Sequence, residues 1–162
     1  MLCFSLWTSI WTALFNHFYM VYFASFGIPW MMFVCMAVFF GMDLAPKQFG
    51  CCILSALCGM AWGQFDFLLI RWFGSLEFGP RITDFVAIVI GTALAMVIHL
   101  GPLAQTPFGL MPFIFAGVCL TFSQGGGNVA GLGFTLVAGI VLAAVCSMGL
   151  HFCMKRFPVK EE

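Results

Sequence analysis

Charged residues are scarce in this sequence. Only 7% of its 162 residues are charged, with six basic and six acidic side chains and a net charge of zero, whereas soluble proteins average about 25%. The chain therefore offers no basic surface to a nucleic acid and no polybasic segment to lipid headgroups. By contrast, 63% of the residues are hydrophobic, which is more than a soluble domain of this length can bury. The composition predicts a protein whose solvent is the lipid bilayer.

The short motifs of common enzymes and metal sites are also missing. The sequence holds no GxSxG, HExxH, Walker or GxGxxG motif, and no cysteine pair has zinc-ligand spacing beside a histidine motif. We therefore expect no enzymatic activity, no catalytic residues, no metal and no cofactor. Most of the eight cysteines lie in apolar runs, so we interpret them as small core residues rather than a disulfide framework.

Six apolar runs approach the length of about 20 residues that a membrane-spanning helix needs. They are roughly 2–23, 26–42, 48–70, 82–101, 108–123 and 130–154. No Lys or Arg precedes the first run, so we interpret it as a retained helix rather than a secretory signal. The second and fifth runs are short and follow Gly/Pro breaks, so they are either ordinary short spans or broken, re-entrant helices. The prediction is an all-α membrane protein of about six transmembrane helices, in one domain over 1–162.

The basic residues predict an orientation. With six spans, both termini face one side of the membrane. That side holds Lys47, Lys155, Arg156 and Lys160, and the other side holds Arg71 and Arg81. Because cytoplasmic loops carry an excess of Lys and Arg, we expect cytoplasmic N and C termini.

The two halves of the chain resemble each other. Small residues recur every four positions in the first and fourth runs, and each of these stripes ends in a histidine. The matching residues, 82 positions apart, are Ser5, Ser9, Ala13 and His17, and Ala87, Gly91, Ala95 and His99. At an offset of about 80, Ser55, Gly59 and Gly63 match Thr135, Gly139 and Ala143. We interpret this as a duplication of halves at about 1–75 and 82–154. Three spans per half is an odd number, so the prediction is a 3+3 inverted repeat.

The small-residue stripes have two interpretations. Residues four apart share a helix face, and small side chains there let helices approach closely in lipid. We expect Gly59, Gly63, Gly91 and Gly139 to serve this packing role, although such faces can also line a pore.

The chain resembles the YcdZ-like family, small bacterial inner-membrane proteins of unknown function. The resemblance lies in "FGIPWMMFVCMAVFFG", "GCCILSALCGMAWG" and "PFGLMPFIFAGVCLTFSQGG". The matching positions are Trp30, Phe39, Phe40, Gly41, Gly59 and Trp62, and then Pro112, Phe113, Gly117, Phe122 and Ser123; no Gly directly follows Pro112. The resemblance implies a multi-helix fold in a bacterial inner membrane, and it supplies no catalytic residue.

Polar residues within apolar runs are functional candidates because lipid makes them costly. The candidates for a solute path are His17, His99, Asn16, Gln124 and Asn128. The two histidines are either the polar mouths of a central path or half-wet residues at the membrane interface. Gln124 and Asn128 flank three glycines, which form either a tight turn with positive φ angles or a polar vestibule.

Two aspartates flank the "RWFGSLEFGPR" connector. Asp66 and Asp84 lie near Arg71 and Arg81, so we expect surface ion pairs there. The alternative is a proton relay, which would need the carboxylates deeper in the membrane.

These observations predict a channel or transporter for a small, uncharged solute, with the path between the halves. The abundant Phe residues would suit a narrow apolar constriction that blocks hydrated ions, although lipid-facing Phe is the commoner arrangement. The alternative is a non-transporting membrane partner or assembly subunit. The expected partners are the lipid bilayer and an unidentified solute, without nucleic acid, and a homo-oligomer is compatible with either function.

Overall fold

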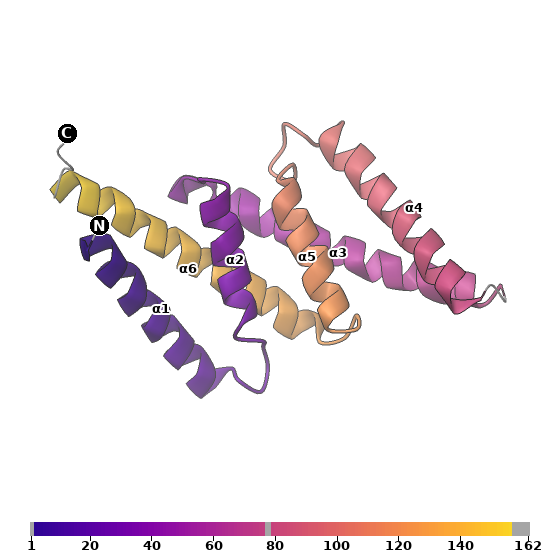
Figure 1. Cartoon of the computed structure of the whole chain (residues 1–162), viewed down its shortest axis with the longest axis horizontal. Helices are drawn as coiled ribbons and strands as arrows, with labels where there is room; N and C mark the ends of the chain where they lie inside the picture. The colour runs from indigo at the N-terminus through magenta and orange to yellow at the C-terminus, as the bar shows by residue number, and fades with distance from the viewer. Residues whose placement is uncertain (1, 77–78, 157–162) are drawn as a thin grey trace. The chain divides into compact units, whose positions relative to one another are not determined.

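Helices account for nearly all of the structure. The computed structural model describes residues 2–76 and 79–156, and over these residues it holds six α-helices, a short 3-10 turn at Pro46–Gln48, and no strand. The helices are α1 (Leu2–Tyr22), α2 (Met31–Gly41), α3 (Phe49–Gly74), α4 (Pro80–Leu100), α5 (Met111–Ser123) and α6 (Val129–Arg156) (Figure 1). Each helix corresponds to one of the six apolar runs, so the prediction of an all-helical chain is confirmed.

Three segments are long and apolar enough to cross a membrane. They are Pro46–Gly74, Arg81–Leu100 and Val129–Leu150. The helices α2 and α5 are apolar but have only 11 and 13 residues. At 1.5 Å per residue they are about 16–20 Å long, which is less than the hydrocarbon thickness of about 30 Å. The three long helices support insertion into a membrane, and the crossing of the bilayer by the other three helices stays a prediction.

The chain forms two compact units. Unit 1 contains 1–49 and 134–162, and unit 2 contains 50–133. The third helix therefore belongs with the fourth and fifth, while most of α6 belongs with the first two helices. This grouping differs from the division of the sequence into halves at about 1–75 and 82–154.

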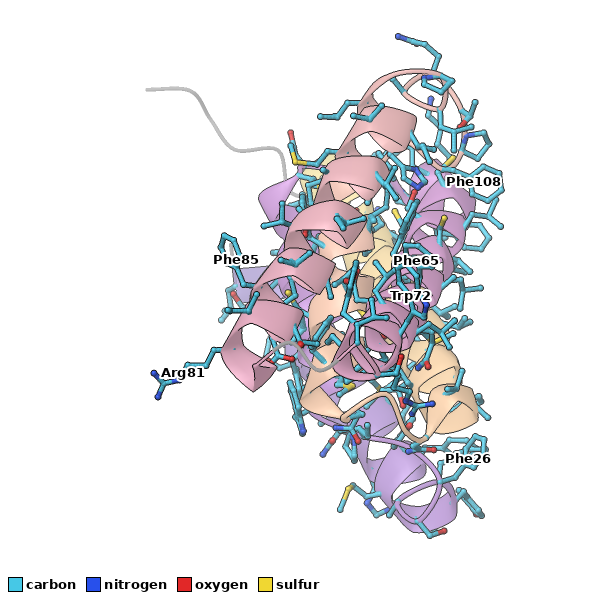
Figure 2. The ribbon with its side chains drawn as sticks, turned by 90° about the vertical axis from the view of Figure 1, so that its right-hand side faces the viewer. Phe26, Phe65, Trp72, Arg81, Phe85 and Phe108 are labelled. Carbon is cyan, nitrogen blue, oxygen red and sulfur yellow. A yellow bond between two sulfur atoms is a disulfide. The ribbon has the colours of Figure 1, made fainter. Side chains whose placement is uncertain are left out.

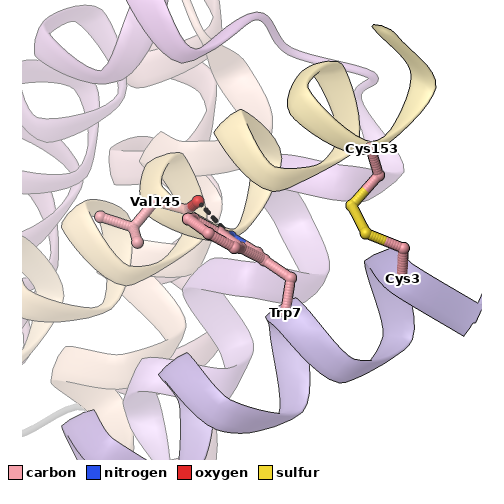
Figure 3. The surroundings of a disulfide bond; sticks show 4 residues. All are labelled: Cys3, Trp7, Val145 and Cys153. Atoms are coloured by element: carbon pink, nitrogen blue, oxygen red, sulfur yellow. Dashed lines mark hydrogen bonds between the residues drawn. A yellow bond between two sulfur atoms is a disulfide. The ribbon is translucent and has the colours of Figure 1, made fainter. Parts of the chain in front are cut away.

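In unit 1, α1 lies alongside α6, and the start of α1 lies near the end of α6 (Figures 1 and 3). The indole Nε1–H of Trp7 donates a hydrogen bond to the carbonyl of Val145 at 3.0 Å. Gly149 leaves room for the Trp7 ring, because a Cβ at this position would overlap it. One turn before Trp7, Cys3 forms a disulfide with Cys153. These two cysteines correct the interpretation of all eight as core residues, since the pairing of cysteines at opposite ends of the chain leaves no spacing signal in the sequence.

The helix α2 packs closely on α6 in the same unit. A Cβ at Gly139 would lie only 2.7 Å from the Cα of Met32. Next to this contact, the hydroxyl of Thr135 accepts a hydrogen bond from the backbone N–H of Ile28 at 3.1 Å. The Thr135 hydroxyl also bonds the hydroxyl of Tyr19, which is buried. A residue of α6 therefore holds the end of α1 and the start of α2.

In unit 2, α5 packs on α3 through glycines on both helices. A Cβ at Gly59 would lie 2.7 Å from the Cα of Ile114, and a Cβ at Gly117 would lie 2.7 Å from the backbone N of Met60. One turn further along, a Cβ at Gly63 would lie 2.7 Å from the Cβ of Thr121. Backbone meets backbone in this unit, as small residues allow when helices associate in lipid.

Large apolar side chains cover the outside of unit 2. Phe85 is 69% exposed and Trp72 is 59% exposed, and Figure 2 shows Phe85 pointing away from its helix. Arg81, in the first turn of the same helix, also extends outward. Exposed apolar surface of this kind is unfavourable in water and suits lipid chains. It supports the bilayer as the solvent for these helices.

We predict that Gly59→Leu and Gly139→Leu each destabilise the protein by about 1–3 kcal/mol, the usual cost of overpacking. Each leucine would push against the backbone of a neighbouring helix. Thermal unfolding of the purified protein in detergent measures the effect. Gly50→Leu is the matched control, because a Cβ at this position meets nothing within 4 Å. Equal stability of all three variants would show that the helices do not depend on these contacts.

Candidate functional site

Unit 2 contains a cavity of about 250 Å³ lined by three of its helices. Its wall includes Trp62 and Asp66 from α3, Gly91 and Thr92 from α4, and Phe115 and Phe122 from α5. Apart from Asp66 and the hydroxyl of Thr92, the wall is mainly aromatic and aliphatic. An apolar pocket with a few converging polar groups is the usual form of a small-molecule site.

Asp66 is the residue that makes this cavity unusual. Its side chain is only 3% exposed, and its Oδ1 atom has no hydrogen-bond partner among the described residues. Gly91 provides the space for the carboxyl group, because a Cβ at Gly91 would overlap Oδ1. A buried carboxyl without a partner costs free energy, and within membrane helices such groups mark functional sites.

The expected surface ion pair at Asp66 is wrong. Arg71, Arg81 and Asp84 are exposed, whereas Asp66 is buried. The sequence separation misled us because the helix between the two residues turns Arg71 away from the face that carries Asp66. A signal for the site was present, since the carboxylate of Asp66 falls inside the predicted span 48–70, where a charge is a functional candidate by default.

His99 lies in the same unit and is fully engaged. It is 1% exposed, its Nδ1 is 2.7 Å from the carbonyl of Phe108, and its Nε2 is 2.9 Å from the indole Nε1 of Trp62. An indole N–H only donates, so Nε2 accepts and Nδ1–H donates to Phe108. The imidazole thus joins the end of α4 to the connector before α5 and holds Trp62 of the cavity wall.

The other predicted path residues lie apart from the cavity wall. In unit 1, His17 is exposed and Asn16 is half-exposed. In unit 2, the Gln124 amide is 3.3 Å from the carbonyl of Ser123, and Asn128 is exposed. His17 and His99 therefore differ in burial, although they end matching stripes in the sequence. The idea that both are half-wet interface residues does not describe His99.

The three glycines form a turn, as one of the two interpretations predicts. Gly125 and Gly126 have φ angles of 57° and 74°, and Asn128 has a φ of 47°. Glycine adopts this left-handed region without steric cost. The Gln64 side chain donates a hydrogen bond to the carbonyl of Gly126 at 3.0 Å, which fastens the turn to α3.

We predict that Trp62→Phe destabilises the protein by about 1–3 kcal/mol. The substitution removes the indole N–H and leaves the buried Nε2 of His99 without its donor. Urea or thermal unfolding in detergent measures the change. Trp72→Phe is the control, since Trp72 is exposed. If both variants lose the same stability, the bond between Trp62 and His99 does not hold this wall.

Comparison with known proteins identifies the family and nothing more specific. No curated protein and no solved structure matches the chain. The YcdZ-like name and a bacterial origin therefore stay predictions. One family model, described as "Protein of unknown function (DUF1097)", matches residues 1–151. The chain thus belongs to this uncharacterised family.

Proposed function

We propose that this protein is a multi-pass channel or transporter that passes a small solute across a bacterial inner membrane. The observation that carries this proposal is the cavity in unit 2, where helices apolar enough to span a membrane enclose a buried carboxyl group without a partner. A membrane protein that only needed to pack would gain stability by replacing Asp66 with an apolar residue. A role in binding a solute explains why the group is there. We propose no enzymatic role, because neither the sequence motifs nor the cavity wall supplies a nucleophile with a base.

The proposed architecture is the 3+3 inverted repeat, and hydrogen bonds support it. In unit 1 the N–H of Ile28 donates to the hydroxyl of Thr135, and in unit 2 the N–H of Leu110 donates to the hydroxyl of Ser55. The larger of the two offsets in the sequence repeat relates the two donors, and the smaller offset relates the two acceptors. Equivalent residues of the repeat therefore make equivalent bonds.

The glycine contacts support the same repeat. Gly139 faces Met32 in unit 1, and Gly59 faces Ile114 in unit 2. The larger offset again relates Met32 to Ile114, and the smaller offset relates the two glycines. In each unit, the first two helices of one half therefore pack with the third helix of the other half. Such an exchange of helices suits a fold that joins two short halves.

The first helices of the two halves depart from the repeat. The stripe of α4 is buried at Ala87, Ala95 and His99, whereas the stripe of α1 is exposed at Ser5, Ser9, Ala13 and His17. Buried Tyr19, which bonds Thr135, takes the place at the end of α1 that His99 takes at the end of α4. We therefore no longer propose the two histidines as paired mouths of a path.

The nature of the solute depends on Asp66. An uncharged solute is the prediction when the helix interior lacks a charged side chain. The burial of Asp66 in the cavity wall removes that premise. The solute that best fits this wall is considered in the next subsection.

A second function, that of a non-transporting membrane partner, is favoured by one observation. The exposed stripe of Ser5, Ser9 and Ala13 on α1 would let another helix approach closely. A second copy of the chain or another membrane subunit would fit this face. Crosslinking from Cys substituted at Ser9 tests for such a neighbour.

We predict that the excess uptake of a solute into proteoliposomes depends on the cavity. Glycerol, urea and tetraethylammonium are the probes, each compared with liposomes that lack the protein. Cys119→Trp should reduce the excess several-fold, because Cys119 lines the cavity and is exposed enough to accept a large ring. Cys51→Trp, outside the cavity wall, is the control. Uptake at the rate of empty liposomes for every probe would favour the non-transporting partner.

We predict that both termini face the cytoplasm, because Lys47, Lys155 and Arg156 lie on their side, together with Lys160, which lies outside the described residues. Reporter fusions after residue 162 and within the connector 75–79 should give opposite results. Since disulfides persist in oxidising compartments, this topology predicts that Cys3 and Cys153 are free thiols in growing cells and pair after extraction in air. A disulfide already present in cells treated with N-ethylmaleimide before lysis would place the termini outside.

A further inference from the structure

We infer that the cavity of unit 2 binds a monovalent organic cation, namely a protonated amine with an apolar body, through the carboxylate of Asp66. This inference deepens the proposed function by naming the class of solute. It depends on that function only for the movement of the cation across the membrane. The binding itself follows from the cavity wall.

The charge of the ligand follows from the charges around the cavity. Asp66 is the only ionisable acid or base with a formal charge in the described wall, where no Lys or Arg lies. The indole N–H of Trp62 already donates to His99, so it is not available to the carboxylate. Thr92 offers one hydroxyl and no charge. A bound cation would supply both the hydrogen-bond donor that Oδ1 lacks and the compensating charge, whereas an anion would be repelled.

The body of the ligand follows from the aromatic side chains. Trp62, Phe115 and Phe122 line the cavity, and the ring of Phe122 stacks on Phe67 with centroids 4.7 Å apart, which supports that part of the wall. Aromatic faces attract organic cations through the ring quadrupole, and this attraction strengthens when water is excluded. The remaining lining, which includes Ile88 and Val118, would cover an aliphatic or aromatic body.

The size and chemistry of the cavity argue against a metal ion. Magnesium and calcium bind several oxygen ligands at once, and the described residues contain no group of three His, Cys, Asp or Glu side chains that could hold a metal. A single carboxylate beside about 250 Å³ of mainly apolar space suits an organic ion better. A proton could also neutralise Asp66, but it would leave the space unfilled.

Gly91 determines where the carboxyl group lies. A Cβ at this position would overlap Oδ1 of Asp66, so Gly91→Ala should displace the carboxylate while it leaves the aromatic wall in place. This substitution separates the position of the charge from its presence.

Binding of two matched probes to the purified, detergent-solubilised protein tests the inference. At neutral pH, 2-phenylethylamine is a cation, and 2-phenylethanol has nearly the same shape without a charge. Isothermal titration should show that the amine binds the wild-type protein roughly tenfold to a hundredfold more tightly than the alcohol, as expected for one charge-assisted bond. Asp66→Asn should remove this difference, and Gly91→Ala should reduce it. Asp84→Asn, at an exposed aspartate, should leave the difference unchanged.

Several results would overturn the inference. Equal binding of amine and alcohol to the wild type would show that apolar contact alone fills the cavity and that a proton satisfies Asp66. Absence of binding by the amine would refute the site, and this comparison needs no variant to fold. If the amine binds but tetraethylammonium and the neutral probes do not cross proteoliposomes, the transport function fails and the binding site survives. If a neutral probe crosses and the amine does not bind, the cation site fails and transport survives.

Discussion

Two hydroxyl groups hold the breaks in this helical fold. In lipid, each backbone polar group needs a partner within the protein, and a helix that begins in the middle of an apolar layer exposes its first N–H groups. Thr135 supplies an acceptor for Ile28 ahead of α2, and Ser55 supplies one for Leu110 ahead of α5. Both hydroxyls project from long helices, so the short helices can begin only where the long helices present them. The packing of each unit depends on this constraint.

The glycine contacts follow from that arrangement and lead to the cavity. Once α5 begins beside Ser55, its Ile114 and Gly117 meet the backbone of α3 around Gly59. Further along α3, the partners become larger: Trp62 lies across from His99, and Asp66 lies against Gly91 of α4. The bulk of the indole ring and the turn of helix between these contacts leave space among the three helices. The cavity is thus a product of close contact at one end of α3 and wider contact further along.

The helices could be predicted from the sequence because lipid imposes long apolar runs, and Gly and Pro interrupt them at 27–29 and 107–112. The turn at Gly125 and Gly126 could be predicted as well, because positive φ angles favour glycine. The partners of individual side chains could not. Whether Asp66 meets Arg71 or Gly91 depends on which face of α3 another helix covers, and the bond of His99 to Trp62 depends on the same choice. The exchange of the third helices between the halves leaves no trace in the composition of either half.

His99 and Asp66 show how two buried polar groups with similar sequence signals have different roles. Both lie inside apolar helices and both are nearly inaccessible. His99 uses both ring nitrogens within the protein, so its cost of burial is offset by the bonds to Phe108 and Trp62. Asp66 leaves an acceptor unused beside an open volume, so its cost is offset only when something else enters. A residue with satisfied bonds explains the stability of the wall, whereas a residue with an unsatisfied one points to a ligand. For this reason the carboxyl group, rather than the histidine, is the centre of the proposed site.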